Sequence, residues 1–227
     1  MAGDARAALP FLDRLAPVDR AALLGTGRPR HYRAGETIFH AGDRGGFVVL
    51  IREGRAKITV PSPSGSPTVL GLRGPGELIG ELSATDPEPA ARSATVSALD
   101  PVICRVVRNA DFRALLSQRP AIALELLATV ASRLRSTDLR LVEVGAYDTA
   151  QRVARLLADM AEAGGRPTDE GLVLPDSLTQ DDLAGLVDAS RESVARALAL
   201  LRAQGLVATG RRRVVVRDLP GLQGYGR

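Results

Sequence analysis

The spacing of apolar residues changes twice along the chain and predicts helices, then strands, then helices again. Before about residue 27, Leu12, Leu15, Ala22 and Leu23 follow helical spacing. From residue 30 to 107, short runs rich in Val, Ile, Leu and Thr are separated by Gly, Pro, Ser and Asp. We expect strands at residues 37–40, 47–51, 56–60, 68–72, 94–98 and 102–107. Six short strands with closely spaced turns predict an antiparallel roll or barrel.

A long helix with a heptad repeat is predicted to follow. Helical spacing returns near Asp111, and Pro120 suits the first position of a helix. Two interleaved series have a spacing of seven residues: Leu127, Leu134 and Leu141, and Val130, Thr137 and Val144, in which Thr137 is the one polar residue. They fit the a and d positions of a parallel coiled coil, so we expect a homodimer. Packing of the same helix on the β roll is the alternative, and it can account for part of the stripe.

Gly145 and Asp148 mark the predicted start of a second domain. Gly145 can end the long helix, and Asp148 can cap the next one. We therefore expect an α+β chain with a β-roll domain at residues 1–117, a dimerisation helix and hinge at 118–146, and a C-terminal domain at 147–227.

Two short helices in the C-terminal domain predict a helix-turn-helix. Thr179 can cap the first helix, and Gln180 is its first residue; Ser190 can cap the second, which runs to about residue 204. Arg191 and Glu192 lie in the first turn of this second helix, where a recognition helix reaches base edges in the major groove.

Arg196 follows one turn later. Arginine suits guanine O6 and N7, and glutamate accepts from cytosine N4. A solvent-exposed helix with a Glu192–Arg196 ion pair is the alternative.

Charge supports a nucleic-acid partner for this region. The whole chain has a net charge of +4, but residues 189–227 hold eight arginines and two acidic residues. A short β-hairpin with Arg211, Arg212 and Arg213 at its tip is expected to form a wing. We assign Arg211 to the DNA phosphates, with a merely solvated tip as the alternative.

Composition limits the other possibilities. The single cysteine, Cys104, excludes an internal disulfide and a multi-cysteine cluster, and with only His31 and His40 we expect no metal site. There is no apolar run of about 18 residues and no good secretory signal, so we expect a cytoplasmic chain without a membrane span. The chain shows no Ser/His/Asp set and no phosphate-loop lysine, so we expect it not to be an enzyme.

A second group of residues, in the predicted roll, predicts a nucleotide-binding site. Gly80, Glu81 and Leu82 are followed, after nine residues, by Arg92 and Ser93. Glycine allows backbone N–H groups to approach an anion, and Arg92 offers a fork of donors to a phosphodiester. Glu81 suits a ribose hydroxyl. A structural Glu81–Arg92 ion pair in a turn is the alternative.

The segments Gly80-Glu81-Leu82, Arg92-Ser93-Ala94 and Ser190-Arg191-Glu192-Ser193-Val194-Ala195-Arg196 resemble the cyclic AMP receptor and fumarate–nitrate regulator family. The resemblance extends from about residue 33 to 216. It implies an N-terminal β roll that binds cyclic AMP in many members, a long dimer helix and a C-terminal winged helix-turn-helix.

Residue by residue, the resemblance implies that Glu81 accepts from the ribose and that Arg92 and Ser93 hold the cyclic phosphate. It implies that Thr137 contacts adenine, and that Arg191, Glu192 and Arg196 read bases. Asp138 departs from the pattern, because cyclic AMP binders of the family usually offer Ser or Asn there from the partner subunit. The segment between Glu81 and Arg92 is also one residue longer than in the type member.

The sequence thus supports a homodimeric transcriptional regulator that binds a palindromic double-stranded DNA site, is controlled by cyclic AMP, and has RNA polymerase as a further expected partner. The alternative is the same DNA-binding dimer responding to another small anion or to no ligand.

Overall fold

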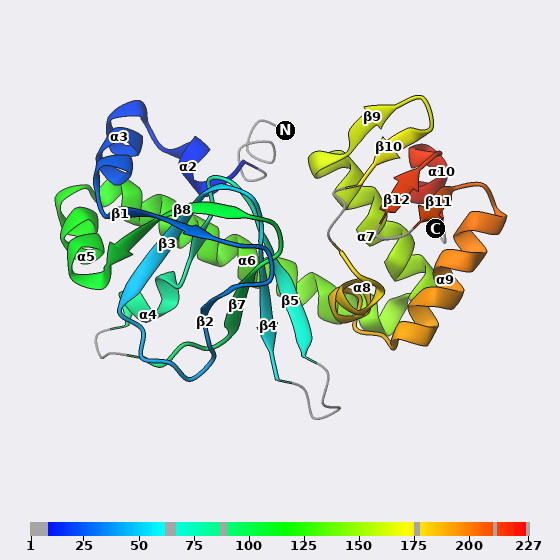
Figure 1. Cartoon of the computed structure of the whole chain (residues 1–227), viewed down its shortest axis with the longest axis horizontal. Helices are drawn as coiled ribbons and strands as arrows, with labels where there is room; N and C mark the ends of the chain where they lie inside the picture. Colours follow the sequence, from blue (N-terminus) through cyan, green and yellow to red (C-terminus); the bar gives the residue numbers. More distant parts are fainter. Residues whose placement is uncertain (1–8, 62–66, 87–89, 175–177, 211–212, 226–227) are drawn as a thin grey trace. The chain divides into compact units, whose positions relative to one another are not determined.

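The structure is a computed structural model that describes residues 9–61, 67–86, 90–174, 178–210 and 213–225. The chain divides into two compact units, residues 1–62 with 70–137 and residues 63–69 with 138–227, so that one boundary falls within a long helix between Thr137 and Asp138. Each unit has its own hydrophobic core. Figure 1 shows both, and they are described in turn.

The first unit is built on two four-stranded sheets, which bears out the predicted α+β fold with an antiparallel β roll (Figure 1). One sheet has the order β1-β8-β3-β6 and the other has the order β2-β7-β4-β5. The strands are β1 (Arg28–Tyr32), β2 (Thr37–Phe39), β3 (Phe47–Glu53), β4 (Ala56–Val60), β5 (Thr68–Arg73), β6 (Leu78–Ile79), β7 (Thr95–Ala98) and β8 (Val102–Arg108).

The central strand β3 explains how the roll is held together. Its residues 48–51 are all buried, because successive side chains of a strand point to opposite faces and both faces are covered. Val48 and Leu50 join a core that also contains residues of the helices. Val49 and Ile51 join the core formed with residues of the second sheet.

Helices cover one face of the roll: α2 (Phe11–Arg14), α3 (Pro17–Gly25), α4 (Glu81–Thr85), α5 (Asn109–Gln118) and the start of α6 (Pro120–Ala146). Ile122 and Leu126 of α6 are buried in that core. Leu127, Leu134 and Leu141 of the same helix remain 62–70% exposed. Packing on the roll therefore uses a different stripe of α6 from the series Leu127, Leu134 and Leu141, while Val130 of the second series is half-buried.

The second unit contains α7 (Thr149–Gly164), β9 (Arg166–Thr168), β10 (Gly171–Val173), α8 (Gln180–Leu186), α9 (Arg191–Ala203), β11 (Val207–Gly210), β12 (Arg213–Val216) and α10 (Leu219–Gly224). Its sheet has the order β11-β12-β10-β9. Val153 and Leu157 of α7 and Val194, Leu198 and Leu201 of α9 meet in one core.

Some elements differ from the sequence prediction. Strand β1 was missed because its sequence, Arg-Pro-Arg-His-Tyr, lies at a sheet edge with four exposed residues and so has no apolar alternation. The short strands β6, β9 and β10 were also missed. Within the described residues, no single helix is both long and apolar enough to cross a membrane, and α5 and α6 pass that test only jointly, across a bend of 112°.

Candidate ligand and DNA-binding sites

Gly80 brings α4 and Arg92 together. It precedes α4 with a left-handed backbone, φ 81°, which glycine adopts without steric cost. A Cβ atom at this position would overlap Nη1 of Arg92 and lie 3.3 Å from the carbonyl oxygen of Phe47. Both the backbone conformation and the closeness of Arg92 therefore require glycine here.

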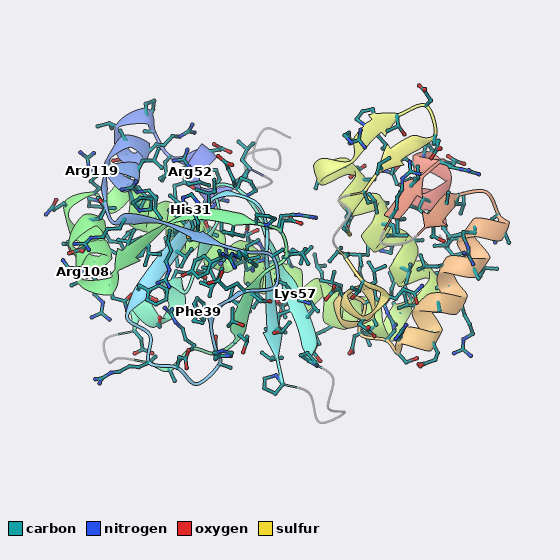
Figure 2. All side chains as sticks on the ribbon, viewed as in Figure 1. His31, Phe39, Arg52, Lys57, Arg108 and Arg119 are labelled. Atoms are coloured by element: carbon teal, nitrogen blue, oxygen red, sulfur yellow. The ribbon has the colours of Figure 1, made fainter. Side chains whose placement is uncertain are left out.

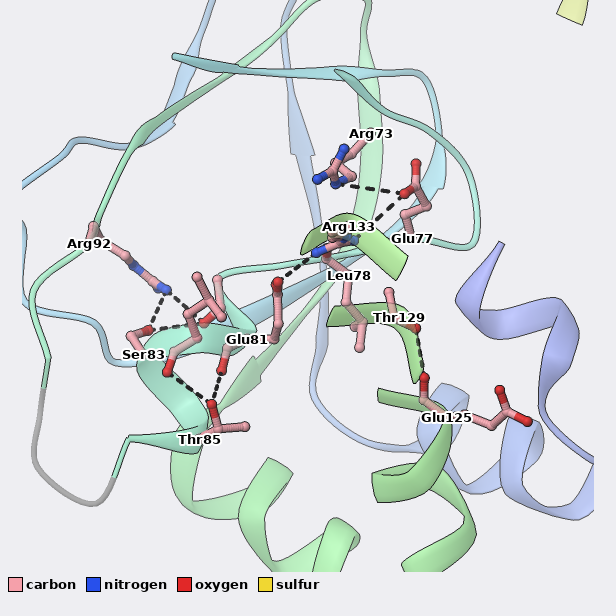
Figure 3. Close-up of polar contacts among 12 residues, drawn as sticks. Arg73, Glu77, Leu78, Glu81, Ser83, Thr85, Arg92, Glu125, Thr129 and Arg133 are labelled. Carbon is pink, nitrogen blue, oxygen red and sulfur yellow. Dashed lines mark hydrogen bonds and ion pairs between the residues drawn. The ribbon is translucent and has the colours of Figure 1, made fainter. Parts of the chain in front are cut away.

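Arg92 is held by the roll itself, with only 4% of the residue exposed. Its Nη1 donates to the Gly80 carbonyl at 3.0 Å and to Oγ of Ser83 at 2.7 Å, and its Nη2 donates to the Phe47 carbonyl at 2.6 Å. Figure 3 shows Arg92 reaching Ser83 at the start of α4. Burial lowers the pKa of the Arg92 guanidinium, with Glu81 and Asp43 opposing that effect.

Glu81 is also buried, with 5% of the residue exposed, but its partner is Arg133 of α6. Nη1 of Arg133 donates to Oε1 of Glu81 at 2.6 Å, and Nη2 donates to the Leu78 carbonyl at 2.9 Å (Figure 3). The ion pairs of the described residues do not include one between Glu81 and Arg92, so that alternative of the sequence analysis was wrong.

Arg133 is thus a candidate site residue that the sequence analysis missed. It lies four residues before Thr137, one helical turn away, and its carbonyl accepts from Oγ1 of Thr137 at 3.0 Å. That spacing is the signal that could have identified it.

The remaining predicted ligand residues lie at the surface. Leu82 is 54% exposed, and Ser93, Thr137 and Asp138 are exposed as well. The structure therefore gathers Gly80, Glu81 and Arg92 around α4, with Glu81 and Arg92 turned to different protein partners.

The helix-turn-helix forms as the capping residues predict. Oγ1 of Thr179 accepts from the backbone N–H of Asp182, and Oγ of Ser190 accepts from the backbone N–H of Ser193. Gln180 is the first residue of α8 and is exposed. Between the helices, Asp188 has φ 50°, so the turn is tight.

The predicted base-reading residues share the outer face of α9. Arg191, Glu192 and Arg196 are all exposed, while Val194, Ala197 and Leu198 face the core. The backbone N–H at the start of α9, followed by the Ser190 hydroxyl, lowers the pKa of the Glu192 carboxyl. Nη2 of Arg196 donates to Oγ of Ser193 at 3.1 Å. The side chains that could reach DNA are therefore presented to solvent.

The wing is the antiparallel hairpin of β11 and β12. Arg211, which the sequence analysis assigned to the DNA phosphates, lies outside the described residues. At the base of the tip, Arg213 pairs with Glu170 at 2.9 Å, which leaves less of its charge for a phosphate.

Metal ligands do not gather in the described part of the chain: no group of three or more His, Cys, Asp or Glu residues could hold an ion there. His31 and His40 are exposed.

Comparisons with known proteins agree with this arrangement. A family model described as the cyclic nucleotide-binding domain matches residues 29–119, and one described as the Crp-like helix-turn-helix domain matches residues 151–225. The chain is 33% identical over 198 residues to the CRP-like cAMP-activated global transcriptional regulator of Mycobacterium tuberculosis, covering 87% of this chain and 88% of that protein.

The chain belongs to the CRP/FNR family of transcriptional regulators. A second family member, the cyclic AMP receptor protein of Thermus thermophilus, is 32% identical over 209 residues, 92% of this chain and 93% of that one. A solved structure of the c-di-GMP responsive global regulator CLP of Xanthomonas campestris shares the CRP/FNR fold, with a TM-score of 0.76 and 23% identity over 89% of this chain and all of that one.

Proposed function

We propose that this CRP/FNR regulator is a homodimer that binds a palindromic DNA site and is controlled by cyclic AMP bound in the β roll. The observation that carries the proposal is the Glu81–Arg133 pair. It joins the buried carboxylate predicted to accept a ribose hydroxyl to α6, the helix with the exposed leucine heptad.

In the proposed complex, the cyclic phosphate binds Arg92, Ser93 and the backbone around Gly80 and Leu82. The ribose hydroxyl donates to Glu81, and the base reaches Thr137 and Asp138. Arg133 of α6 pairs with Glu81 and lies one helical turn before Thr137. A ligand that contacts Glu81 or Thr137 therefore acts on α6 as well. A ligand shifts the conformation only through its different affinity for the two states.

Dimerisation along Leu127, Leu134 and Leu141 would pair two recognition helices. Helix-turn-helix dimers read half-sites about 34 Å apart, or multiples of that distance, on a palindrome. In this proposal, Arg191, Glu192 and Arg196 contact base edges. Thr179, Gln180, Ser190 and Arg211 contact the backbone. We also propose the domain limits 1–117, 118–146 and 147–227, and RNA polymerase as a partner.

A second candidate is the same DNA-binding dimer responding to another small anion or to no ligand. The engagement of Arg92 by three oxygen atoms of the protein favours it, because these donors are not turned to a ligand.

Isothermal titration with cyclic AMP, cyclic GMP and c-di-GMP separates the two candidates. We expect cyclic AMP to bind best. Arg92→Gln should weaken it by about 10-fold to 150-fold, because a hydrogen bond to a charged group contributes about 1.5–3 kcal/mol. Arg52→Gln, which changes an exposed arginine of β3, is the matched control. Equal affinity of the Arg92→Gln variant would refute the site assignment.

DNA binding at fixed salt, with and without each nucleotide, tests the other half. Arg196→Ala should cost about 1–3 kcal/mol of discrimination between the correct base and its alternatives. Arg202→Ala, at the far end of α9, should leave discrimination unchanged. A uniform loss on all sequences with Arg196→Ala would indicate a phosphate contact instead.

A further inference from the structure

The surroundings of Arg92 contain two aromatic rings. The guanidinium carbon lies 4.1 Å from the ring centre of Phe39, the last residue of β2, and 4.8 Å from that of Phe47, the first residue of β3. Figure 2 labels Phe39 within the roll. The two rings meet edge to face, with centres 6.1 Å apart. The guanidinium therefore has two aromatic rings as well as oxygen acceptors beside it.

The hydrogen bonds of Arg92 complete this enclosure. Ser83 has two roles, because its Oγ accepts from Arg92 and donates to the Gly80 carbonyl at 3.0 Å. Nε of Arg92 is buried and has no hydrogen-bond partner among the described residues. The donor that the protein leaves unused is thus beyond the reach of an anion in this conformation.

We propose that Phe39, Phe47 and Ser83 form a latch on Arg92, which an anionic ligand must open before it can bind. The proposal rests on the proposed nucleotide site. A charged phosphate is a stronger acceptor than the carbonyls and the hydroxyl that now hold Arg92. It must nevertheless displace them and leave the rings, whose attraction for a desolvated cation is substantial.

The latch lowers the apparent affinity by the fraction of molecules in which Arg92 is released. This factor is the same for every ligand that needs Arg92 released, so only a ligand that makes further contacts still binds at low concentration. An inorganic anion makes only the phosphate contacts with Arg92, Ser93 and the backbone around Gly80, whereas a cyclic nucleotide also contacts Glu81. Phe39, Phe47 and Ser83 are therefore positioning residues that set the affinity of the site through Arg92.

Replacing one of the two aromatic rings with an aliphatic side chain tests the latch. Phe39→Leu removes the nearer ring and keeps an apolar side chain, and it should bind cyclic AMP about tenfold more tightly than the wild type in isothermal titration. Phe11→Leu is the matched control, because Phe11 is 1% exposed in a different core, whereas the ring contacts of Arg92 are with Phe39 and Phe47. The affinity of the Phe11→Leu variant for cyclic AMP should equal that of the wild type. Ser83→Ala provides a second variant, expected to shift affinity in the same direction.

Nuclear magnetic resonance of ¹⁵N-arginine protein without added nucleotide gives an independent readout. The Nε–H signal of Arg92, assigned by its loss in Arg92→Lys, should exchange slowly with solvent and be shifted upfield by the rings. In Phe39→Leu, the Nε–H proton of Arg92 should exchange with solvent faster than in the wild type. Exchange in the wild type as fast as that of a surface arginine would overturn the latch.

The titrations distinguish failure of the latch from failure of the proposed function. If the wild type binds cyclic AMP in an Arg92-dependent way and Phe39→Leu binds no more tightly, only the latch is refuted. If no variant binds any of the cyclic nucleotides, the proposed function fails, and the latch fails with it.

Discussion

Replacing Gly80 by alanine measures how firmly Arg92 is held. Gly80 and Gly35 have nearly the same left-handed backbone, with φ 81° and 82°, so alanine at either position costs about 1–2 kcal/mol in backbone strain. A Cβ atom at Gly35 meets no other atom within 4 Å, whereas at Gly80 it overlaps Nη1 of Arg92. Only Gly80→Ala must therefore displace the guanidinium.

The displaced guanidinium loses its hydrogen bonds to the Gly80 carbonyl and to Ser83. At about 1.5 kcal/mol for each, the lower end for charged groups, this adds about 3 kcal/mol. We expect Gly80→Ala to lose about 4–5 kcal/mol of unfolding free energy and Gly35→Ala about 1–2 kcal/mol.

Urea unfolding of both variants without nucleotide, followed by far-ultraviolet circular dichroism, measures the difference. Equal losses would show that Arg92 yields at no cost, and they would refute the reasoning from its hydrogen bonds.

Three further changes test other parts of the structure. Leu134→Ala removes three carbon atoms from a residue that is 62% exposed, so a dimer that buries both copies should lose about 3 kcal/mol of association free energy. Sedimentation should show the dissociation constant rising roughly a hundredfold. Val18→Ala, at an exposed position of α3, should leave it unchanged. Arg133→Met leaves the Glu81 carboxylate buried without its partner and should cost about 3–5 kcal/mol in urea unfolding, with much of this recovered when Glu81→Gln is added. Burial raises the pKa of the Cys104 thiol to about 11 from 9.0, so a thiol reagent at pH 8 should modify only unfolded protein. The free energy of unfolding that this thiol contributes is present below pH 9.0 and should be lost as the pH rises through 11. Rapid labelling of the folded protein would contradict this.

Local patterns were sufficient for much of the fold. Six strands of the roll (β2, β3, β4, β5, β7 and β8), the long helix from Pro120 and the caps Asp148, Thr179 and Ser190 follow from residues close together in sequence. Such elements depend on side-chain period and on capping within one turn, which a sequence displays directly. Strand β1 was not predicted because it has no apolar alternation of its own. It is a strand through its pairing with β8, which lies 70 to 78 residues away in sequence.

In the candidate ligand site, too, the sequence predicted one part and only the structure showed the other. Its residue types, Gly80, Glu81 and Arg92, could be recognised from the sequence, and so could the recognition helix of the DNA-binding unit. The partners of these residues could not. Arg133 meets Glu81 across 52 residues, and Phe47 meets Arg92 across 45. The packing of helix on sheet and of strand on strand decides these pairings, because a side chain's hydrogen-bond partner depends on distance in space, which no local spacing of residues records.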